Sequence, residues 1–372
     1  MMIKRILFFL SILFFAQTVS GQGQSEWNQF RGNTALTGVT KATLPTSLSI
    51  RWSFKTGDNI KASPVISHGI IVVGSTDCHL YALTLKGKLL WKLKTENSIE
   101  APALIMNGTV FAGNLDGTLY ALDLKTGKKK WKYSTENQIM GSPSYWQSGN
   151  KKYILFGSYD YCFYCLDAQT GKLKWKYETG NYINGAAAIV GNLAIFGGCD
   201  GFLHMVNIET GKLRKKINVG TYVASSVTVD HNRAFTGDYD GKFSCIGLNE
   251  KKVIWKHQDE KATSPFIASP ALIDNYIIVG NRDKLLYCFN KNNGKLLWKK
   301  SMGGRIDASA VISTNKIVVA TMKGDIKIVN LKDGQILLSH EIGSAISGSP
   351  AVIDGLIVVG AEDGKIYCLG KK

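Results

Sequence analysis

Short apolar runs alternate with turns rich in Gly, Asn and Asp along most of the chain. Within these runs, β-branched and aromatic residues alternate with other residues, which is the two-residue period of a half-buried strand. Residues 70–74, for example, form an apolar run that ends on a glycine. No long run with the 3.6-residue period of a helix appears after residue 22. The pattern therefore predicts an all-β protein made of strands and hairpins.

The pattern repeats about every forty residues, with four strand signals in each repeat. Residues 116–131 show the unit, Asp-Gly-Thr-Leu-Tyr-Ala-Leu-Asp-Leu-Lys-Thr-Gly-Lys-Lys-Lys-Trp, and sister segments match it. The final tryptophan, which we interpret as a structural anchor, recurs at Trp52, Trp91, Trp131, Trp175, Trp255 and Trp298. Lys215 and Leu338 hold the anchor position in two further repeats. A period of this length is typical of a β-propeller.

The number of repeats favours a closed ring. Small-residue segments such as 62–64 begin eight units. The strand at 50–54, which contains the first anchor tryptophan, is not preceded by the other three strands of a unit. The last unit, 347–369, has three strands and lacks the fourth. We expect the N-terminal strand to pair with these C-terminal three, which removes exposed sheet edges. The sequence thus predicts an eight-bladed β-propeller of four-stranded antiparallel blades at 47–372, after an N-terminal extension at 22–46.

Residues 1–21 have the pattern of a secretory signal peptide. Lys4 and Arg5 precede an apolar stretch at 6–16, and small and polar residues follow as far as Gly21, near which we expect cleavage. The apolar stretch is shorter than the roughly twenty residues that span a bilayer. No cysteine lies near the cleavage region, which argues against a lipid anchor. We therefore predict a periplasmic or secreted monomer with no transmembrane span after cleavage.

Seven cysteines in an exported chain raise the question of disulfides. Four of them fill the repeat position that alanine fills in sister repeats, and these are Cys165, Cys245, Cys288 and Cys368. We interpret them as small buried core residues. Cys162 points to the opposite strand face from Cys165, and Cys78 and Cys199 lie in or beside turns. We therefore predict neither a disulfide framework nor a metal site.

The recurring Leu-Tyr-Ala-Leu-Asp-x-x-Thr-Gly-x-x-x-Trp resembles the repeat of the pyrroloquinoline-quinone-like (PQQ-like) β-propellers, and it covers residues 47–370. The segment Trp27-Asn28-Gln29-Phe30-Arg31-Gly32, with Gly38 after it, resembles the leader of many exported propellers of this type. Members of the family include BamB, a propeller of outer-membrane β-barrel assembly, and quinoprotein alcohol dehydrogenases. The resemblance specifies the fold, whereas the same blade serves both enzymes and scaffolds.

The dehydrogenase branch of the family implies a quinone in the central channel, stacked between a tryptophan and a disulfide of adjacent cysteines. It also implies a calcium ion held by acidic and amide side chains, with an aspartate as base. This chain has no adjacent cysteine pair, and no segment matches the calcium ligands. His79 and His204 stand at strand positions, where a structural role is the more common one. We therefore expect no catalytic residue and no cofactor. The alternative is that the chain binds PQQ together with calcium.

A ring of chemically mixed positions is the candidate binding site. The residue before each small-residue segment should lie beside the central channel, and this position varies although the repeats are otherwise alike. In chain order the ring is Lys61, Glu100, Met140, Asn184, Val223, Ile267, Asp307 and Ser347. Neighbouring turn positions that vary in the same way are Asn114, Tyr159, Asp238, Tyr239, Arg282 and Glu362. A ligand or partner is predicted here, at the channel mouth, and the alternative is neutral drift of loops.

The chain carries a net charge of +17, or +15 without Lys4 and Arg5. Many basic residues lie near the hairpin before the anchor, and they are Lys125, Lys128, Lys129, Lys130, Lys132, Lys172, Lys174, Lys176, Lys212, Arg214, Lys215, Lys251, Lys252, Lys256, Lys295, Lys299 and Lys300. They predict a basic rim on the face opposite the mixed ring. The rim either protects strand edges and solubility or attracts an anionic surface. The export signal argues against nucleic acid as a partner.

Two functions follow from the sequence. The first is a non-catalytic exported scaffold or binding module that binds a protein partner at the cell envelope, BamB-like in outer-membrane protein assembly. The alternative is a propeller that binds PQQ or another small ligand and is related to the quinoprotein dehydrogenases.

Overall fold

The structure is a computed structural model that describes residues 26–223 and 225–371. All regular elements in these ranges are strands, which confirms the all-β prediction. The predicted signal peptide at 1–21 lies outside the described residues, so it stays a prediction together with the domain boundaries drawn from it. No helix in the described part of the chain has the length and apolar character needed to cross a membrane.

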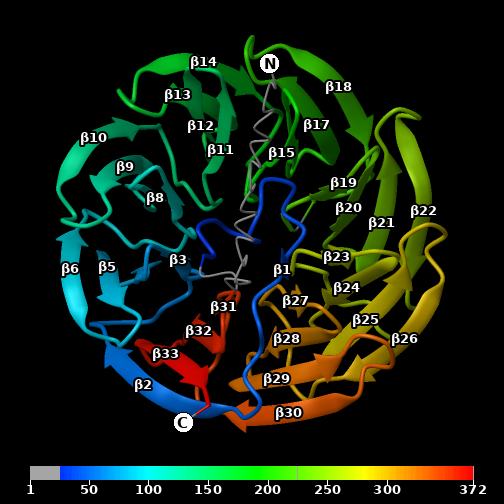
Figure 1. Ribbon diagram of the computed structural model, residues 1–372. Helices are drawn as coiled ribbons and strands as arrows, with labels where there is room; N and C mark the ends of the chain where they lie inside the picture. The colour runs from blue at the N-terminus through cyan, green and yellow to red at the C-terminus, as the bar shows by residue number, and fades with distance from the viewer. Residues whose placement is uncertain (1–25, 224, 372) are drawn as a thin grey trace, which may run out of the picture.

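Eight sheets form the blades of a ring, as Figure 1 shows. The first three blades are β3 (Val65–Ser67), β4 (Ile70–Gly74), β5 (His79–Thr84), β6 (Leu89–Lys94); β7 (Leu104–Met106), β8 (Thr109–Gly113), β9 (Thr118–Asp123), β10 (Lys129–Ser134); and β11 (Ser144–Ser148), β12 (Lys151–Gly157), β13 (Cys162–Asp167), β14 (Leu173–Glu178). The next three are β15 (Ala188–Val190), β16 (Leu193–Gly197), β17 (Phe202–Asn207), β18 (Leu213–Asn218); β19 (Thr228–Asp230), β20 (Arg233–Gly237), β21 (Lys242–Gly247), β22 (Lys252–Gln258); and β23 (Ala271–Ile273), β24 (Tyr276–Gly280), β25 (Leu285–Asn290), β26 (Leu296–Ser301).

The last two blades contain the ends of the chain. They are β27 (Val311–Ser313), β28 (Lys316–Ala320), β29 (Asp325–Asn330), β30 (Ile336–Glu341), and β31 (Ala351–Ile353), β32 (Leu356–Gly360), β33 (Lys365–Gly370), β2 (Ser49–Lys55). In the final sheet, β2 pairs antiparallel with β33, and Trp52 lies opposite Cys368. The predicted closure of the ring by the N-terminal strand is confirmed.

Each blade is an antiparallel meander that runs from the channel outward. The innermost strand is short, and the two middle strands are almost entirely buried, as in β8 and β9. The outermost strand alternates between half-buried and exposed residues, as in β14. Apolar side chains of adjacent blades pack together, so the core is a series of sheet-to-sheet interfaces arranged around the ring.

The tryptophan anchors join each blade to the next. The indole Nε1 of Trp91 donates a hydrogen bond of 2.8 Å to the carbonyl oxygen of Leu124, in the following blade. The ring also lies against Gly127, where an added Cβ would stand 2.6 Å from an indole carbon. At one of the two anchor positions without tryptophan, Lys215 Nζ donates to the carbonyl oxygen of Leu248 at 2.7 Å. The facing hairpin there has Lys251 in place of glycine, so the tryptophan and the glycine are absent together.

Residues 26–46, which we call the strap, run inside the ring (blue in Figure 1). Backbone hydrogen bonds join the strap to seven blades, for example from Ile105 N to Asn28 O at 2.7 Å and from Ile189 N to Thr34 O at 2.7 Å. Near its end, β1 (Val39–Thr40) pairs in parallel with β27. The strap therefore satisfies backbone groups that the innermost strands would otherwise present to the channel.

The cysteines agree with the predicted core positions. All seven are unpaired, and the four that align with alanine are fully buried. Burial raises the pKa of Cys245, Cys288 and Cys368 to about 12, so these thiols stay protonated at neutral pH. Cys162 is buried as well, whereas Cys78 and Cys199 are half-buried.

Candidate binding site at the channel mouth

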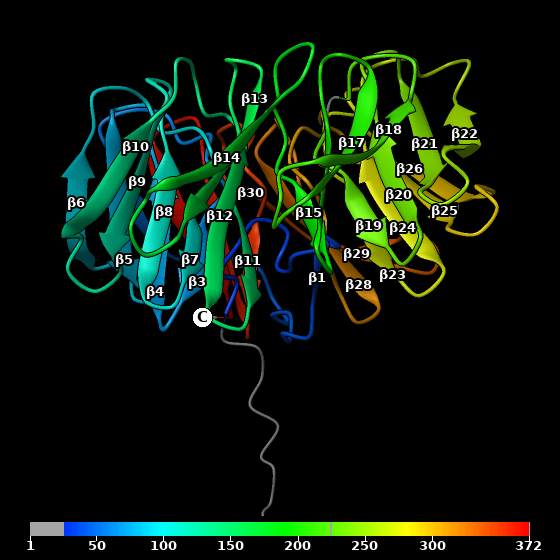
Figure 2. The same ribbon diagram turned by 90° about the horizontal axis from the view of Figure 1, so that it is seen from above.

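The ring has two faces with different loops. The loops from each outermost strand to the next innermost strand, and the turns between second and third strands, form one face, which we call the mouth face (upper side of Figure 2). The other two sets of hairpins form the opposite face, which we call the hairpin face. The C-terminus and the strap lie toward the hairpin face in the same view.

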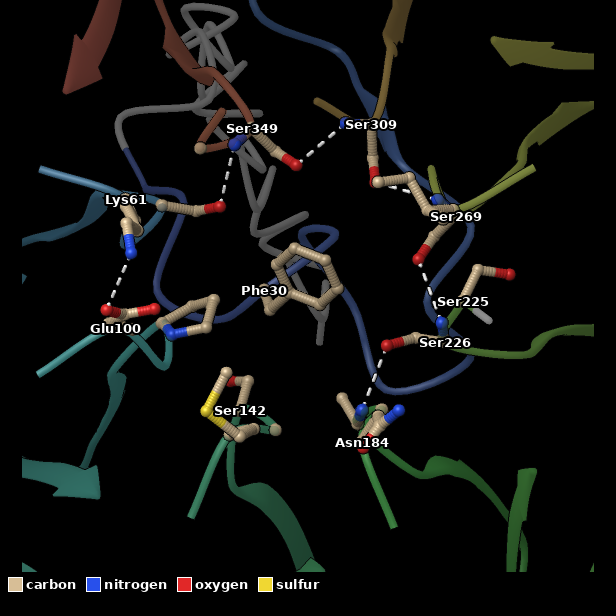
Figure 3. Close-up of a pocket in the computed structure, with 18 of the residues that line it drawn as sticks. Phe30, Lys61, Glu100, Ser142, Asn184, Ser225, Ser226, Ser269, Ser309 and Ser349 are labelled. Carbon is tan, nitrogen blue, oxygen red and sulfur yellow. Dashed lines mark hydrogen bonds and ion pairs between the residues drawn. The ribbon is translucent and has the colours of Figure 1, made fainter. Parts of the chain in front are cut away.

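The mouth face opens into a cavity of about 180 Å³ on the channel axis. Six of the predicted site residues line it, and they are Lys61, Glu100, Met140, Asn184, Asp307 and Ser347. Ile267, the sixth ring position in chain order, also lines it, so seven of the eight ring positions do. Figure 3 shows Lys61, Glu100 and Asn184 among the side chains that converge on the cavity from different blades. The structure thus brings most of the predicted ring together, while its binding role stays a prediction.

Val223 was assigned to this ring by the sequence analysis, and that assignment is wrong by one residue. Val223 is buried, and its side chain packs on Gly197, as Ile99 packs on Gly74 in an earlier blade. The cavity is instead lined by Ser225 and Ser226 from this blade. The error comes from two consecutive serines, which allow two alignments of the small-residue segment.

Phe30 from the strap forms the floor of the cavity and lies in the centre of Figure 3. The next residue, Arg31, is fully buried and donates to the carbonyl oxygens of Ala310 at 2.6 Å and Pro270 at 2.9 Å. Burial lowers the pKa of Arg31 to about 9, so the guanidinium is charged at neutral pH. Gly38 lies directly against that guanidinium, where no Cβ would fit. The leader motif therefore positions Phe30 as the floor of the cavity, a role that was not predicted from the sequence.

A collar of serines surrounds the cavity above Phe30. Backbone N–H groups of one blade donate to the serine Oγ of the next, at 2.8 to 3.1 Å, and the accepting residues are Ser63, Ser226, Ser269, Ser309 and Ser349. Pro102 occupies the same position in another blade and has no N–H to donate. Each serine hydroxyl can still donate one hydrogen bond. The recurrence of serine in the small-residue segments was the available but unused sequence signal.

Charged residues at the mouth are paired with one another. Lys61 Nζ lies 2.9 Å from Glu100 Oε1. Arg282 binds Asp307 through two hydrogen bonds of 3.1 Å, and Arg305 Nε lies 3.4 Å from the same carboxylate. The pairs neutralise both carboxylates that line the cavity.

Two polar atoms at the cavity wall have no hydrogen-bond partner within the described part of the chain. Asn184 donates from Nδ2 to Cys199 Sγ at 3.2 Å, and its Oδ1 accepts nothing. Ser347 Oγ is equally unpartnered. Buried polar atoms of this kind favour a ligand or ordered water that donates to them.

The six predicted turn positions lie around the cavity and do not line it, and they are Asn114, Tyr159, Asp238, Tyr239, Arg282 and Glu362. Asp238 is buried and accepts backbone N–H groups of two neighbouring residues at 3.0 and 2.8 Å, so it holds its turn. Burial raises its pKa. Asn114 accepts two N–H groups in the same way, at 3.1 and 2.8 Å.

Tyrosines gather on the mouth face beside the cavity. Tyr159 stacks on Tyr182 with ring centroids 4.6 Å apart, and Tyr161 lies 5.2 Å from the same ring. An antiparallel bridge between Val223 and Asp238 sets Tyr222 opposite Tyr239. We call these five residues, Tyr159, Tyr161, Tyr182, Tyr222 and Tyr239, the tyrosine arc. Tyr161, Tyr182 and Tyr222 were not predicted as site residues.

The predicted basic rim lies on the hairpin face and the outermost strands. Its residues are exposed, except for Lys215, which is half-buried by its bond to the next blade. Some are partly neutralised, since Lys130 lies 3.8 Å from Asp123 and Lys174 lies 3.7 Å from Asp167. Within the described residues, no group of three or more His, Cys, Asp or Glu side chains is arranged to hold a metal ion.

Solved structures of known proteins share this fold. BamB from Moraxella catarrhalis superposes with a TM-score of 0.73 at 19% identity, over 88% of this chain and 98% of that chain. A quinohemoprotein alcohol dehydrogenase from Comamonas testosteroni gives 0.79 at 13% identity, over 94% and 81%. The computationally designed protein Ika8 gives 0.74 at 20% identity, over 85% and 98%. A comparison with curated protein sequences finds no match.

The sequence itself matches a family described as outer membrane protein assembly factor BamB, over residues 37–158, 87–299 and 282–372. The match confirms the predicted resemblance to PQQ-like propellers. Because the matched residues run through all eight blades, the chain belongs to this BamB family of β-propellers.

Proposed function

We propose that this protein is a non-catalytic binding module of the cell envelope, which docks a protein partner on its mouth face and acts, like BamB, in outer-membrane protein assembly. The observation that carries the proposal is the tyrosine arc. Four of its side chains are the exposed large aromatic residues of the described chain, at 39 to 52% exposure.

Exposed tyrosines in a cluster favour a protein partner. Tyrosine is enriched at the centres of protein interfaces, because it buries a large apolar area and keeps a hydroxyl for hydrogen bonding. Three neighbouring blades contribute the arc, through loops 158–161, 179–187, 219–227 and 238–241. A rigid ring holds these loops, so binding needs little ordering of the protein.

The location at the envelope rests on two supports. The family match is to an outer-membrane assembly factor. The N-terminal sequence has the charge, apolar stretch and small residues of a signal peptide. A periplasmic site of action agrees with both.

The cavity residues do not fit the quinone and calcium of the dehydrogenase branch. Phe30 occupies the channel axis, and the cavity of about 180 Å³ is smaller than the roughly 300–1,000 Å³ of typical cofactor pockets. The two carboxylates of the wall, Glu100 and Asp307, are already paired with basic side chains.

A photocrosslinking experiment tests the proposal. A photoreactive amino acid replaces Tyr182 or Tyr239 on the mouth face, and Leu297 on the outermost strand serves as the exposed control. In cells that produce the full chain, we expect mouth-face positions to yield a discrete adduct that contains an outer-membrane assembly protein. Adducts only at Leu297, or a melting-temperature increase with PQQ and calcium but no adduct, would contradict it.

A further inference from the structure

The charge of the molecule is divided between its surfaces. The eight outermost strands carry sixteen lysine or arginine residues and two glutamates. On the mouth face the balance reverses over the first five blades, in the loops between residues 56 and 241. The described residues of these loops contain ten acidic side chains, Asp58, Asp77, Glu96, Glu100, Asp116, Glu136, Asp160, Asp200, Asp238 and Asp240, and one basic side chain, Lys61.

The tyrosine arc lies within this acidic half of the mouth face. Asp160 stands between Tyr159 and Tyr161, and Asp240, which follows Tyr239, is exposed and lies 3.2 Å from Lys242 Nζ. The loops of the arc also border the cavity, since Asn184, two residues after Tyr182, lines its wall. Aromatic rings, carboxylates and a small polar cavity therefore form one continuous surface.

We propose that this surface binds a basic segment of the partner, an extended stretch of polypeptide rich in arginine or lysine. The inference rests on the proposed function and names the chemistry of the partner. Arginine and lysine are attracted to the faces of tyrosine rings, and carboxylates beside those rings add charge-assisted hydrogen bonds. Both attractions operate on one segment only if its side chains are cationic.

The cavity adds a reason for an extended segment. At about 180 Å³ it has room for one long side chain. Asn184 belongs to the cavity lining, and its buried Oδ1, which is unpartnered within the described chain, can only accept a hydrogen bond. A guanidinium or ammonium group supplies donors and no acceptor. One basic side chain would thus enter the cavity while its neighbours lie across the tyrosine arc.

A second copy of this chain is a poorer occupant, although its outer wall is basic. The outermost strands form the outer wall of the ring (Figure 1), and two lysines of this wall, Lys130 and Lys174, are paired with acidic residues of their own blade. A rigid outer wall reaches neither the cavity nor its acceptor atoms. An extended segment reaches both, so the geometry favours an external partner.

The test measures binding of two labelled peptides to the full chain by fluorescence anisotropy, in about 0.15 M salt. One peptide carries six arginines separated by Gly-Ser spacers, and the other carries six glutamates in the same spacers. We expect the arginine peptide to bind and the glutamate peptide not to bind. Because exposed charges are screened, raising the salt to about 0.5 M should weaken binding several-fold.

Variants locate the site. Y182A and D240N should each weaken binding of the arginine peptide at least five-fold, and the double variant further. The matched controls are L297A and D333N, which remove an exposed apolar side chain and an exposed carboxylate away from the mouth face and should leave binding within two-fold. Unchanged melting temperatures exclude misfolding as the cause.

Several outcomes overturn the inference. Equal binding of both peptides, or loss of binding in D333N and not in D240N, contradicts it. Concentration-dependent dimers that Y182A abolishes would make the occupant a second copy. If crosslinking at Tyr182 captures an assembly protein while the arginine peptide does not bind, the proposed function stands and the basic segment is wrong. If the peptide binds but no protein is captured, the proposed function fails instead.

Discussion

Because a tryptophan of one blade contacts a glycine of the next, two glycines of the same blade should differ in how much stability is lost when each is replaced by alanine. Gly127 and Gly108 both have a φ of +68°, in hairpins at the same end of the β7–β10 blade. An added Cβ at Gly127 would stand 2.6 Å from Trp91, whereas nothing lies within 4 Å of Gly108. The variants G127A and G108A therefore share the backbone penalty and differ in the contact with the indole.

The magnitude follows from these contacts. A left-handed conformation costs alanine about 1–2 kcal/mol relative to glycine, and G108A should lose that much. In G127A the indole must also move, which adds about 1–3 kcal/mol of overpacking. Its 2.8 Å hydrogen bond to Leu124 O contributes about 1 kcal/mol and would weaken. We expect G127A to be the less stable variant by about 2–4 kcal/mol.

Urea unfolding followed by circular dichroism measures the difference, with the same protein concentration and pH for each variant. Comparable m-values indicate that midpoints report stability rather than a change in unfolding mechanism. A third variant, W91A, completes a double-mutant cycle with G127A. Without the indole, G127A should lose only the backbone penalty of about 1–2 kcal/mol. Equal losses in G108A and G127A, or additive losses in the cycle, would refute the reasoning.

Three further predictions concern buried groups and the missing anchor. Burial lowers the pKa of His204 in the folded protein, so the unfolded chain binds a proton first as the pH falls below about 6.5, and stability is lost. H204Y, which restores the tyrosine of sister blades opposite Asp200, should flatten the change in melting temperature between pH 7 and pH 5. R31M should lower the free energy of unfolding by about 2 kcal/mol, measured in urea, because the Ala310 carbonyl loses its donor. The double variant K215W/K251G should raise the melting temperature by rebuilding an anchor pair, and K215W alone should not.

The repeat made the ring predictable, because each blade encodes the same local pattern. Anchors, closure by β2 and the buried Cys165 position all follow from aligning repeats of about forty residues. Most of the cavity wall was predictable for the same reason, since ring positions stand at fixed offsets. The floor was not, because Phe30 reaches the channel through contacts with segments far along the chain, and no local period encodes them. Tyr182 and Tyr222 were missed because they lie in the loops that precede the small-residue segments, where no strand pattern allows the repeats to be aligned.

The strap has a consequence for the order of folding. Arg31 bonds to a carbonyl 279 residues away, and Ser313 bonds back to Ala42 across 271 residues. Contacts at such separations form slowly, because distant segments must meet before any interaction repays the lost chain entropy. The N-terminal segment is synthesised first, yet its binding groove exists only when the late blades have joined the ring. The time course over which residues 26–46 become protected from proteolysis during refolding should therefore report the time course of ring closure. In a chain that lacks the last blade, the same segment should stay accessible to the protease.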